Sequence, residues 1–138
     1  MMTEPWLILP IELYQQMEAH IMSTYPEEGC GIVGGKDSTA SVVFCIENEL
    51  HSPVQYRMKP EEQLQSMVYL DHHNLDFLAA FHSHPNGPQQ PSETDIEQWY
   101  YFDAVLLIWF QSENNWQLSG FSINGDIVTP VEIQVVSP

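Results

Sequence analysis

Two uninterrupted apolar segments constrain the fold of this chain more than any other feature. Residues 77–81 read Phe-Leu-Ala-Ala-Phe, and residues 104–110 read Ala-Val-Leu-Leu-Ile-Trp-Phe. Neither segment alternates polar and apolar residues, as a strand with one solvated face would. Both are far too short to span a membrane. We therefore expect two buried strands, with residues 104–110 as a central strand of the sheet.

The segments around these runs predict helices and further strands. Pro10 and Pro60 stand where a helix can begin, since proline fits the first turn, and Pro26 stops the first helix. Helices are expected over residues 10–25, from residue 60 onward, and over residues 92–102. Further strands are expected at residues 6–9, 29–35, 41–47, 116–123 and 127–136, with turns at 36–38 and 124–126. This mixture of helices with mainly adjacent strands predicts a mixed α/β or α+β sandwich.

Length and composition predict one domain over residues 1–138, because 138 residues is too short for two full cores. The sequence contains no apolar run of 18 residues, and its first residues lack the pattern of a signal peptide. We therefore expect a cytoplasmic protein. Cys30 and Cys45 fit no zinc-ribbon spacing and are expected to be free thiols.

The net charge of −16 excludes some partners and leaves others open. Lys36, Arg57 and Lys59 are the only basic side chains. Nucleic acid and anionic membranes are therefore not expected as partners, because both would be repelled. The charge fits solubility or an acidic environment, and it equally fits attraction of a basic partner or peptide.

The segment His82-Ser83-His84 carries the chemistry that the sequence indicates. Side chains alternate along a strand, so two histidines at its end point to the same face and can bind one metal ion. Asp95 falls in the first turn of the next predicted helix, and the stiff loop before it can fold that turn back over the strand end. Two nitrogen ligands, one oxygen ligand and an open position are the form of a catalytic zinc site.

A zinc-bound water needs a carboxylate to take and return its proton, and Glu27 or Glu28 could do so. Ser92 could donate a hydrogen bond to an oxyanion. The same residues also have commoner interpretations, in which they serve only the structure. Ser92 to Asp95 also matches a helix capping box, and two consecutive glutamates are usually exposed. Cys30 could be a nucleophile, but it lies in an apolar strand without a cationic neighbour.

Taken together, these motifs resemble the JAMM (MPN+, or JAB1/MPN/Mov34) metalloprotease family. That family has an upstream Glu, then His-x-His, seven residues, Ser, two residues and Asp. The seven residues are 85–91 here, and the serine and aspartate positions are Ser92 and Asp95. The family glutamate stands three residues before the first strand glycine, which selects Glu28 and not Glu27. Segments 48–50 and 56–60 also resemble bacterial members, so the resemblance spans residues 7–125.

The resemblance implies a deaminase-like sandwich, a curved mixed β-sheet flanked by about three helices. It implies one Zn²⁺ per chain on His82, His84 and Asp95, with Glu28 as acid and base and Ser92 supporting the oxyanion. Such enzymes hydrolyse the peptide or isopeptide bond after the C-terminal Gly-Gly of ubiquitin-like or sulfur-carrier proteins. It also implies that residues 48–58 form a strand edge along which the substrate tail lies.

Two other classes stay open. A non-catalytic MPN-type scaffold or binding module would share the fold, although such relatives typically lack the metal ligands. A deaminase would need its Glu beside a ligand and a Pro-Cys-x-x-Cys pair, neither of which is present. The sequence does not indicate an oligomeric state.

Overall fold

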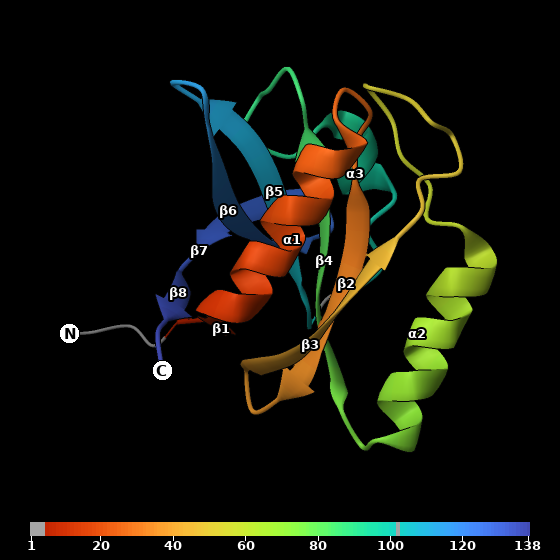
Figure 1. The fold of residues 1–138 in the computed structure, drawn as a ribbon, viewed down its shortest axis with the longest axis vertical. Helices are drawn as coiled ribbons and strands as arrows, with labels where there is room; N and C mark the ends of the chain where they lie inside the picture. The colour runs from red at the N-terminus through yellow and green to blue at the C-terminus, as the bar shows by residue number, and fades with distance from the viewer. Residues whose placement is uncertain (1–4, 102) are drawn as a thin grey trace.

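The structure, a computed structural model, describes residues 5–101 and 103–138. In that part of the chain one eight-stranded sheet is accompanied by three helices (Figure 1). The elements follow one another as β1 (Leu7–Pro10), α1 (Ile11–Thr24), β2 (Cys30–Lys36), β3 (Thr39–Ile46), α2 (Pro60–His72), β4 (Asp76–His84), α3 (Glu93–Glu97), β5 (Val105–Ser112), β6 (Asn115–Asn124), β7 (Ile127–Val131) and β8 (Ile133–Val136). Among these residues no helix is long and apolar enough to cross a bilayer.

The sheet curves until its two ends approach each other. Its strand order is β7-β6-β5-β4-β2-β3-β1-β8. The two end strands, β7 and β8, are separated in the chain only by Glu132. The prediction of one strand over residues 127–136 is therefore wrong. The first half pairs antiparallel with β6, and the second half leaves to pair in parallel with β1.

Both faces of the central strands are buried, as the two apolar runs predict. Leu106 and Ile108 of β5 lie in the core cluster that includes Leu70 of α2. Leu107 and Trp109 lie in the other core cluster, which includes Met17 and Ile21 of α1. Figure 1 shows α1 lying across the sheet. The mixed sheet, its curvature and the flanking helices confirm the predicted fold class.

Gly31 allows β2 and β4 to lie close together. It is paired with Phe81, and a Cβ at residue 31 would fall 2.3 Å from the Phe81 ring and 2.2 Å from the Phe44 carbonyl oxygen. Only glycine leaves this space free. The close pairing of β2 with β4 brings the residues just before β2 beside the end of β4.

The third helix is shorter than predicted. It ends at Glu97, whereas the sequence predicted a helix to residue 102. Phe102 lies outside the described residues, as do residues 1–4, where the expected lack of a signal peptide falls in part. Trp99 is part of the core cluster that includes Leu70 of α2, and Tyr101 packs against that cluster. Residues two apart project to opposite sides of a helix but to the same side of an extended chain. The chain therefore leaves the helix so that both aromatic rings can be buried.

The edge strand predicted over residues 48–58 is also wrong. This segment is a loop whose ends are joined by a single bridge between Asn48 and Met58. The strands at the ends of the sheet are β7 and β8, whereas β4 lies in its middle.

Candidate metal centre

The end of β4 places two histidines on one face of the sheet. His82 and His84 are both buried. They project to the same side of the sheet as Ala80, which lies in the core cluster that includes Leu70 of α2. The Nε2 atoms of the two rings lie 3.0 Å apart. Asp95, in the first turn of α3, reaches the pair with Oδ2, which lies 3.1 Å from His82 Nε2 and 3.2 Å from His84 Nε2. The loop before α3 thus folds back over the strand end, as predicted.

Neighbouring groups hold two of these side chains in position. His84 Nδ1 donates to the carbonyl oxygen of Pro88 at 2.7 Å, so in the neutral imidazole Nε2 carries the lone pair that a metal would take, whereas in the protonated imidazole Nε2 donates to Asp95. Ser92 and Asp95 form the capping box that the sequence indicated. The Asp95 N–H donates to Ser92 Oγ at 3.0 Å, and the Ser92 N–H donates to Asp95 Oδ2 at 2.9 Å. No acceptor takes the Ser92 hydroxyl proton within the described part of the chain.

Burial and hydrogen bonding shift the pKa values of all three groups. Burial lowers the pKa of His82. Burial alone would also lower the pKa of His84, but its bonds to Asp95 and to the Pro88 carbonyl raise that pKa overall. Burial alone would raise the pKa of Asp95, but hydrogen bonds from the two histidines hold it below its ordinary value. A metal ion on these atoms would displace a proton from the cluster.

The donor set fits a zinc ion. In a tetrahedral site with bonds of about 2.0–2.1 Å, ligand atoms are about 3.3 Å apart. The three separations of 3.0, 3.1 and 3.2 Å approach that value. In the described part of the chain, His82, His84 and Asp95 are the group of side chains close enough together to hold a metal. Two imidazoles and one carboxylate are ligands that zinc accepts, and they leave a fourth position for water.

Glu28 lies beside this cluster in a buried position. Only 5% of its surface is exposed, and burial raises the pKa of its carboxyl group to about 8. The backbone of the next residue, Gly29, is bonded to Ser83 in both directions. Gly29 N–H donates to Ser83 Oγ at 2.8 Å, and Ser83 N–H donates to Gly29 O at 3.0 Å. Ser83 stands between the two histidines, so these bonds fix Glu28 relative to them.

The neighbouring Glu27 has a different environment. Its side chain is 37% exposed and lies 3.0 Å from His51 Nδ1 at the surface. Of the two glutamates that the sequence offers, the structure places Glu28 in the cleft with His84 and Asp95. Burial also raises the pKa of Cys30 to about 12, so this thiol is not poised to become a nucleophile.

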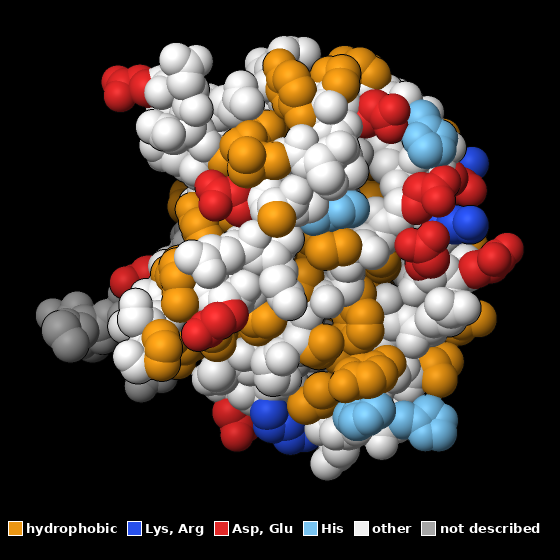
Figure 2. Space-filling view, in the orientation of Figure 1, with side chains coloured by type: hydrophobic (Ala, Val, Ile, Leu, Met, Phe, Trp, Pro, Cys, Tyr) orange, Lys and Arg blue, Asp and Glu red, His pale blue; other side chains and the backbone are white. Residues whose placement is uncertain are grey.

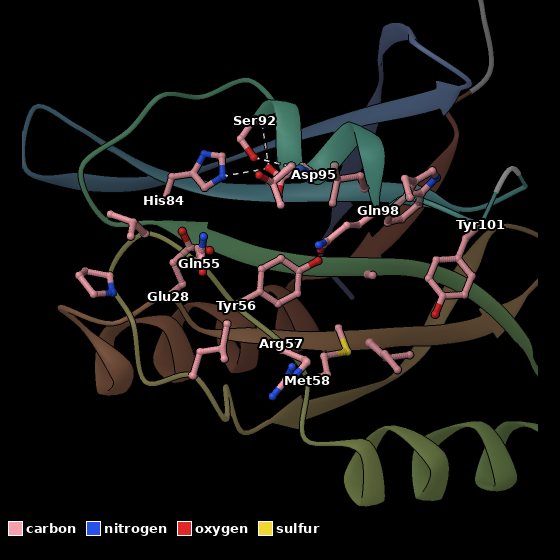
Figure 3. A pocket seen from close by; sticks show the side chains of 18 of the residues that line it. Glu28, Gln55, Tyr56, Arg57, Met58, His84, Ser92, Asp95, Gln98 and Tyr101 are labelled. Atoms are coloured by element: carbon pink, nitrogen blue, oxygen red, sulfur yellow. Dashed lines mark hydrogen bonds and ion pairs between the residues drawn. The ribbon is translucent and has the colours of Figure 1, made fainter.

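Glu28, His84, Ser92 and Asp95 line a cleft of about 820 Å³. Figure 3 shows Glu28 and His84 at one end and Tyr101 at the other, with Ser92 and Asp95 on one wall and the 55–58 loop on the opposite wall. Tyr56 on that loop stacks on the His82 ring, with centroids 4.4 Å apart and planes inclined by 21°. The spacing of the motif gave no sign of this contact, because it joins segments far apart in the chain.

Acidic side chains are scattered over the face seen in Figure 2, and basic ones are few. Two of the three basic residues are Arg57, in the loop of residues 55–58 that walls the cleft, and Lys59, directly after that loop. Arg57 pairs with Glu49, and Lys59 Nζ lies 3.9 Å from Glu47 Oε1. These surface ion pairs are exposed and contribute little to stability.

Comparison with known proteins identifies the family. A family model described as prokaryotic homologs of the JAB domain matches residues 10–119. The chain belongs to this family. The match includes all five candidate site residues and confirms the resemblance seen in the sequence.

Two relatives in this JAB family have names that describe their activity. A desampylase of Pyrococcus furiosus is 33% identical over 118 residues, which cover 79% of this chain and 84% of the relative. A CysO-cysteine peptidase of Mycobacterium tuberculosis is 26% identical over 133 residues, covering 94% of this chain and 91% of the relative. These relatives confirm the prediction that this JAB-family chain is an enzyme of the peptidase class.

Solved structures show the same fold. A protein of Desulfitobacterium hafniense solved in solution has a TM-score of 0.82 at 28% identity, covering 96% of this chain and 94% of its own. A JAB1/MPN domain protein from Archaeoglobus fulgidus has a TM-score of 0.61 at 18% identity, covering 94% of this chain and 96% of its own. At that identity the second likeness concerns the fold alone.

Proposed function

We propose that this JAB-family chain is a zinc-dependent peptidase that hydrolyses the bond after the C-terminal Gly-Gly of a ubiquitin-like or sulfur-carrier protein. One observation carries the proposal. His82 Nε2, His84 Nε2 and Asp95 Oδ2 converge within 3.2 Å of one another, and two of these residues, His84 and Asp95, line a cleft together with the buried residue Glu28. The scaffold alternative gives no reason for burying these groups together.

In the proposed reaction a bound zinc ion would lower the pKa of a water molecule and polarise the scissile carbonyl. Glu28 would accept the proton of the attacking water and later deliver it to the leaving amine. The pKa of about 8 is that of the metal-free protein, and a bound zinc ion would lower it toward the range in which a carboxylate takes and returns a proton at neutral pH. Ser92 would donate its free hydroxyl proton to the oxyanion that forms on the substrate.

The proposed substrate rests on two supports. Relatives named desampylase, TtuB-protein conjugate cleaving protease and CysO-cysteine peptidase carry names that refer to conjugates of small proteins. A glycine before the scissile bond would leave room at a cleft walled by Glu28, His84 and Ser92, where a larger side chain would crowd the attack. The acidic surface would favour a tail with basic residues upstream.

We also propose the cytoplasm as the compartment. Cys30 and Cys45, both within the described residues, are free thiols. Unpaired cysteines are the usual state in a reducing environment.

A substrate panel tests the proposed function. Purified chain, loaded with one zinc ion per molecule, is incubated with ubiquitin-like proteins that carry short extensions after Gly-Gly, and with matched Ala-Ala versions. We expect cleavage after the second glycine, and at least about tenfold slower cleavage of the Ala-Ala versions, equivalent to about 1.4 kcal/mol in the barrier. Mass spectrometry of the products locates the cut.

Three outcomes would contradict the proposal. Equal rates on both versions, or cuts at many sites in an unfolded protein such as casein, would leave a general peptidase without tail specificity. Tight binding of the ubiquitin-like proteins without any cleavage would support a scaffold. Glu28→Gln serves as the matched control, because it should keep the zinc and lose turnover.

A further inference from the structure

Asn48 is a buried side chain just after β3 that is bonded to three segments. It is 6% exposed. Its Nδ2 donates to the carbonyl oxygens of Glu28 and Gln55, both at 3.0 Å. Its Oδ1 accepts from the N–H groups of Leu50 and Arg57, both at 3.1 Å. The amide therefore uses its donors and acceptors to tie the two arms of the 48–58 loop to each other and to Glu28.

The backbone of Glu28 is bonded to this loop on both of its polar groups. Its carbonyl oxygen accepts from Asn48, and its N–H donates to the carbonyl oxygen of Ser52 at 2.8 Å. On the other side, Gly29 is bonded to Ser83 between the two histidines. The glutamate is thus held between the histidine strand and the loop, and the loop keeps its shape through Asn48.

We propose that Asn48 is a positioning residue that sets Glu28 and the cleft wall of residues 50–57 relative to the metal ligands. This inference rests on the proposed function, in which Glu28 is the base. Asn48 contacts neither the three ligand atoms nor the cleft, so it acts through Glu28 and through the loop.

Position matters strongly for a residue with this role. A general base must lie within hydrogen-bond reach of the proton it moves. A misplacement of about 1 Å by a mutation outside the chemistry can lower turnover about a hundredfold. Substitution of Asn48 would loosen the attachment of the Glu28 backbone to the 48–58 loop. The bonds between Gly29 and Ser83 would still attach it to β4.

Two substitutions separate the bonds of Asn48. Asn48→Ala removes all four bonds. Asn48→Asp keeps the oxygen that accepts from Leu50 and Arg57, and it replaces the amide nitrogen by an oxygen, which removes the two donor bonds, including the one to Glu28. Ser66→Ala is the matched control, because Ser66 is 3% exposed, donates to the Glu62 carbonyl oxygen at 2.9 Å, and lies outside the cleft.

We expect Asn48→Ala and Asn48→Asp to keep one zinc ion per chain and to lower kcat by about ten- to a hundredfold, with KM changed only a few-fold. Ser66→Ala should keep its kcat. In a Glu28→Gln background, measured in single turnovers, Asn48→Ala should lower the residual rate by only a few-fold, because the base is already gone and only the displaced cleft wall can still slow the reaction. A full additional loss in that background, or an Asn48→Asp enzyme with the wild-type kcat, would overturn the proposal.

A second measurement does not depend on peptidase activity. Amide hydrogen exchange at Glu28 should become at least about tenfold faster in both Asn48 variants, while the Ser83 amide keeps its protection. If the wild-type chain cleaves nothing, the proposed function fails, and this exchange still decides whether Asn48 holds Glu28. Unchanged exchange at Glu28 would refute the positioning role whatever the activity.

Discussion

Burial of Glu28 predicts that Glu28→Gln makes the metal-free protein more stable while it lowers turnover by about a hundredfold or more. The carboxyl group is buried, and its pKa rises from 4.5 to about 8. The unfolded chain can ionise this group freely above pH 4.5, and the folded chain resists ionisation until about pH 8. Glutamine has nearly the same shape and stays neutral, so it removes this cost of folding.

The sign and size of the effect follow from proton linkage. The folded state binds the Glu28 proton more tightly, so its contribution to stability is full below pH 4.5 and falls as pH rises toward 8. The fall is about 1.4 kcal/mol per pH unit. At pH 7 the wild type should therefore be about 3 kcal/mol less stable than Glu28→Gln, and near pH 4 the two should be equal.

Urea unfolding of the chelator-treated proteins measures this difference. Midpoints for wild type and Glu28→Gln are compared from pH 4 to pH 9, with m-values checked for equality. All other titrating groups are shared by the two proteins, so the difference isolates residue 28. Glu27→Gln is the matched control and should stay within about 0.5 kcal/mol of wild type, because Glu27 is partly exposed.

Added zinc should reduce the difference between wild type and Glu28→Gln, since a nearby dication favours the ionised carboxylate. The reasoning is refuted by equal midpoints at pH 7. It is also refuted by a difference that grows as the pH falls, because that would mean a lowered pKa for Glu28.

The remaining predictions concern the metal, the serine and the thiol. His84→Ala should lose both zinc and activity, measured by elemental analysis and turnover, and full zinc occupancy in a His82→Ala, His84→Ala double variant would rule out this site. Ser92→Ala should cost about 1 kcal/mol of stability through the lost cap and lower kcat about a hundredfold; an unchanged kcat would leave only the cap. Alkylation with iodoacetamide should leave turnover intact, because the Cys30 thiol is buried and its pKa is raised to about 12; inhibition that follows modification of Cys30 would contradict this.

Local patterns in the sequence were enough to predict much of the fold and the candidate cluster. The apolar runs identified β4 and β5, because strands covered on both faces need continuous apolar sequence. The alternation of side chains along β4 predicted that His82 and His84 share a face. The capping pattern located Asp95 in a first helical turn, and the structure shows both arrangements.

The features that the sequence did not predict depend on contacts between distant segments. The chain breaks its strand at Glu132 because the curved sheet brings its two ends together there. This curvature depends on all eight strands and cannot be read from the sequence of one segment. The early end of α3 reflects burial of Trp99 and Tyr101 at a core cluster built from distant parts of the chain, including Phe77, on which the Tyr101 ring packs. The links from Asn48 to Glu28 and from Tyr56 to His82 span 20 and 26 positions, and no periodicity marks them.

The same burial that prepares the site for catalysis makes the metal-free fold costly. Glu28 is buried without a counter-charge bonded to it in the described structure, and His82 Nδ1 is buried without a hydrogen-bond partner there. An ion that binds only the folded chain adds about 4 kcal/mol when its free concentration is a thousand times its Kd. That gain is comparable to the cost of about 3 kcal/mol that linkage assigns to Glu28 at pH 7. A metal held by His82, His84 and Asp95 would therefore offset the free-energy cost of burying Glu28, so that in the proposed reaction the same ion would also stabilise the fold that positions the base.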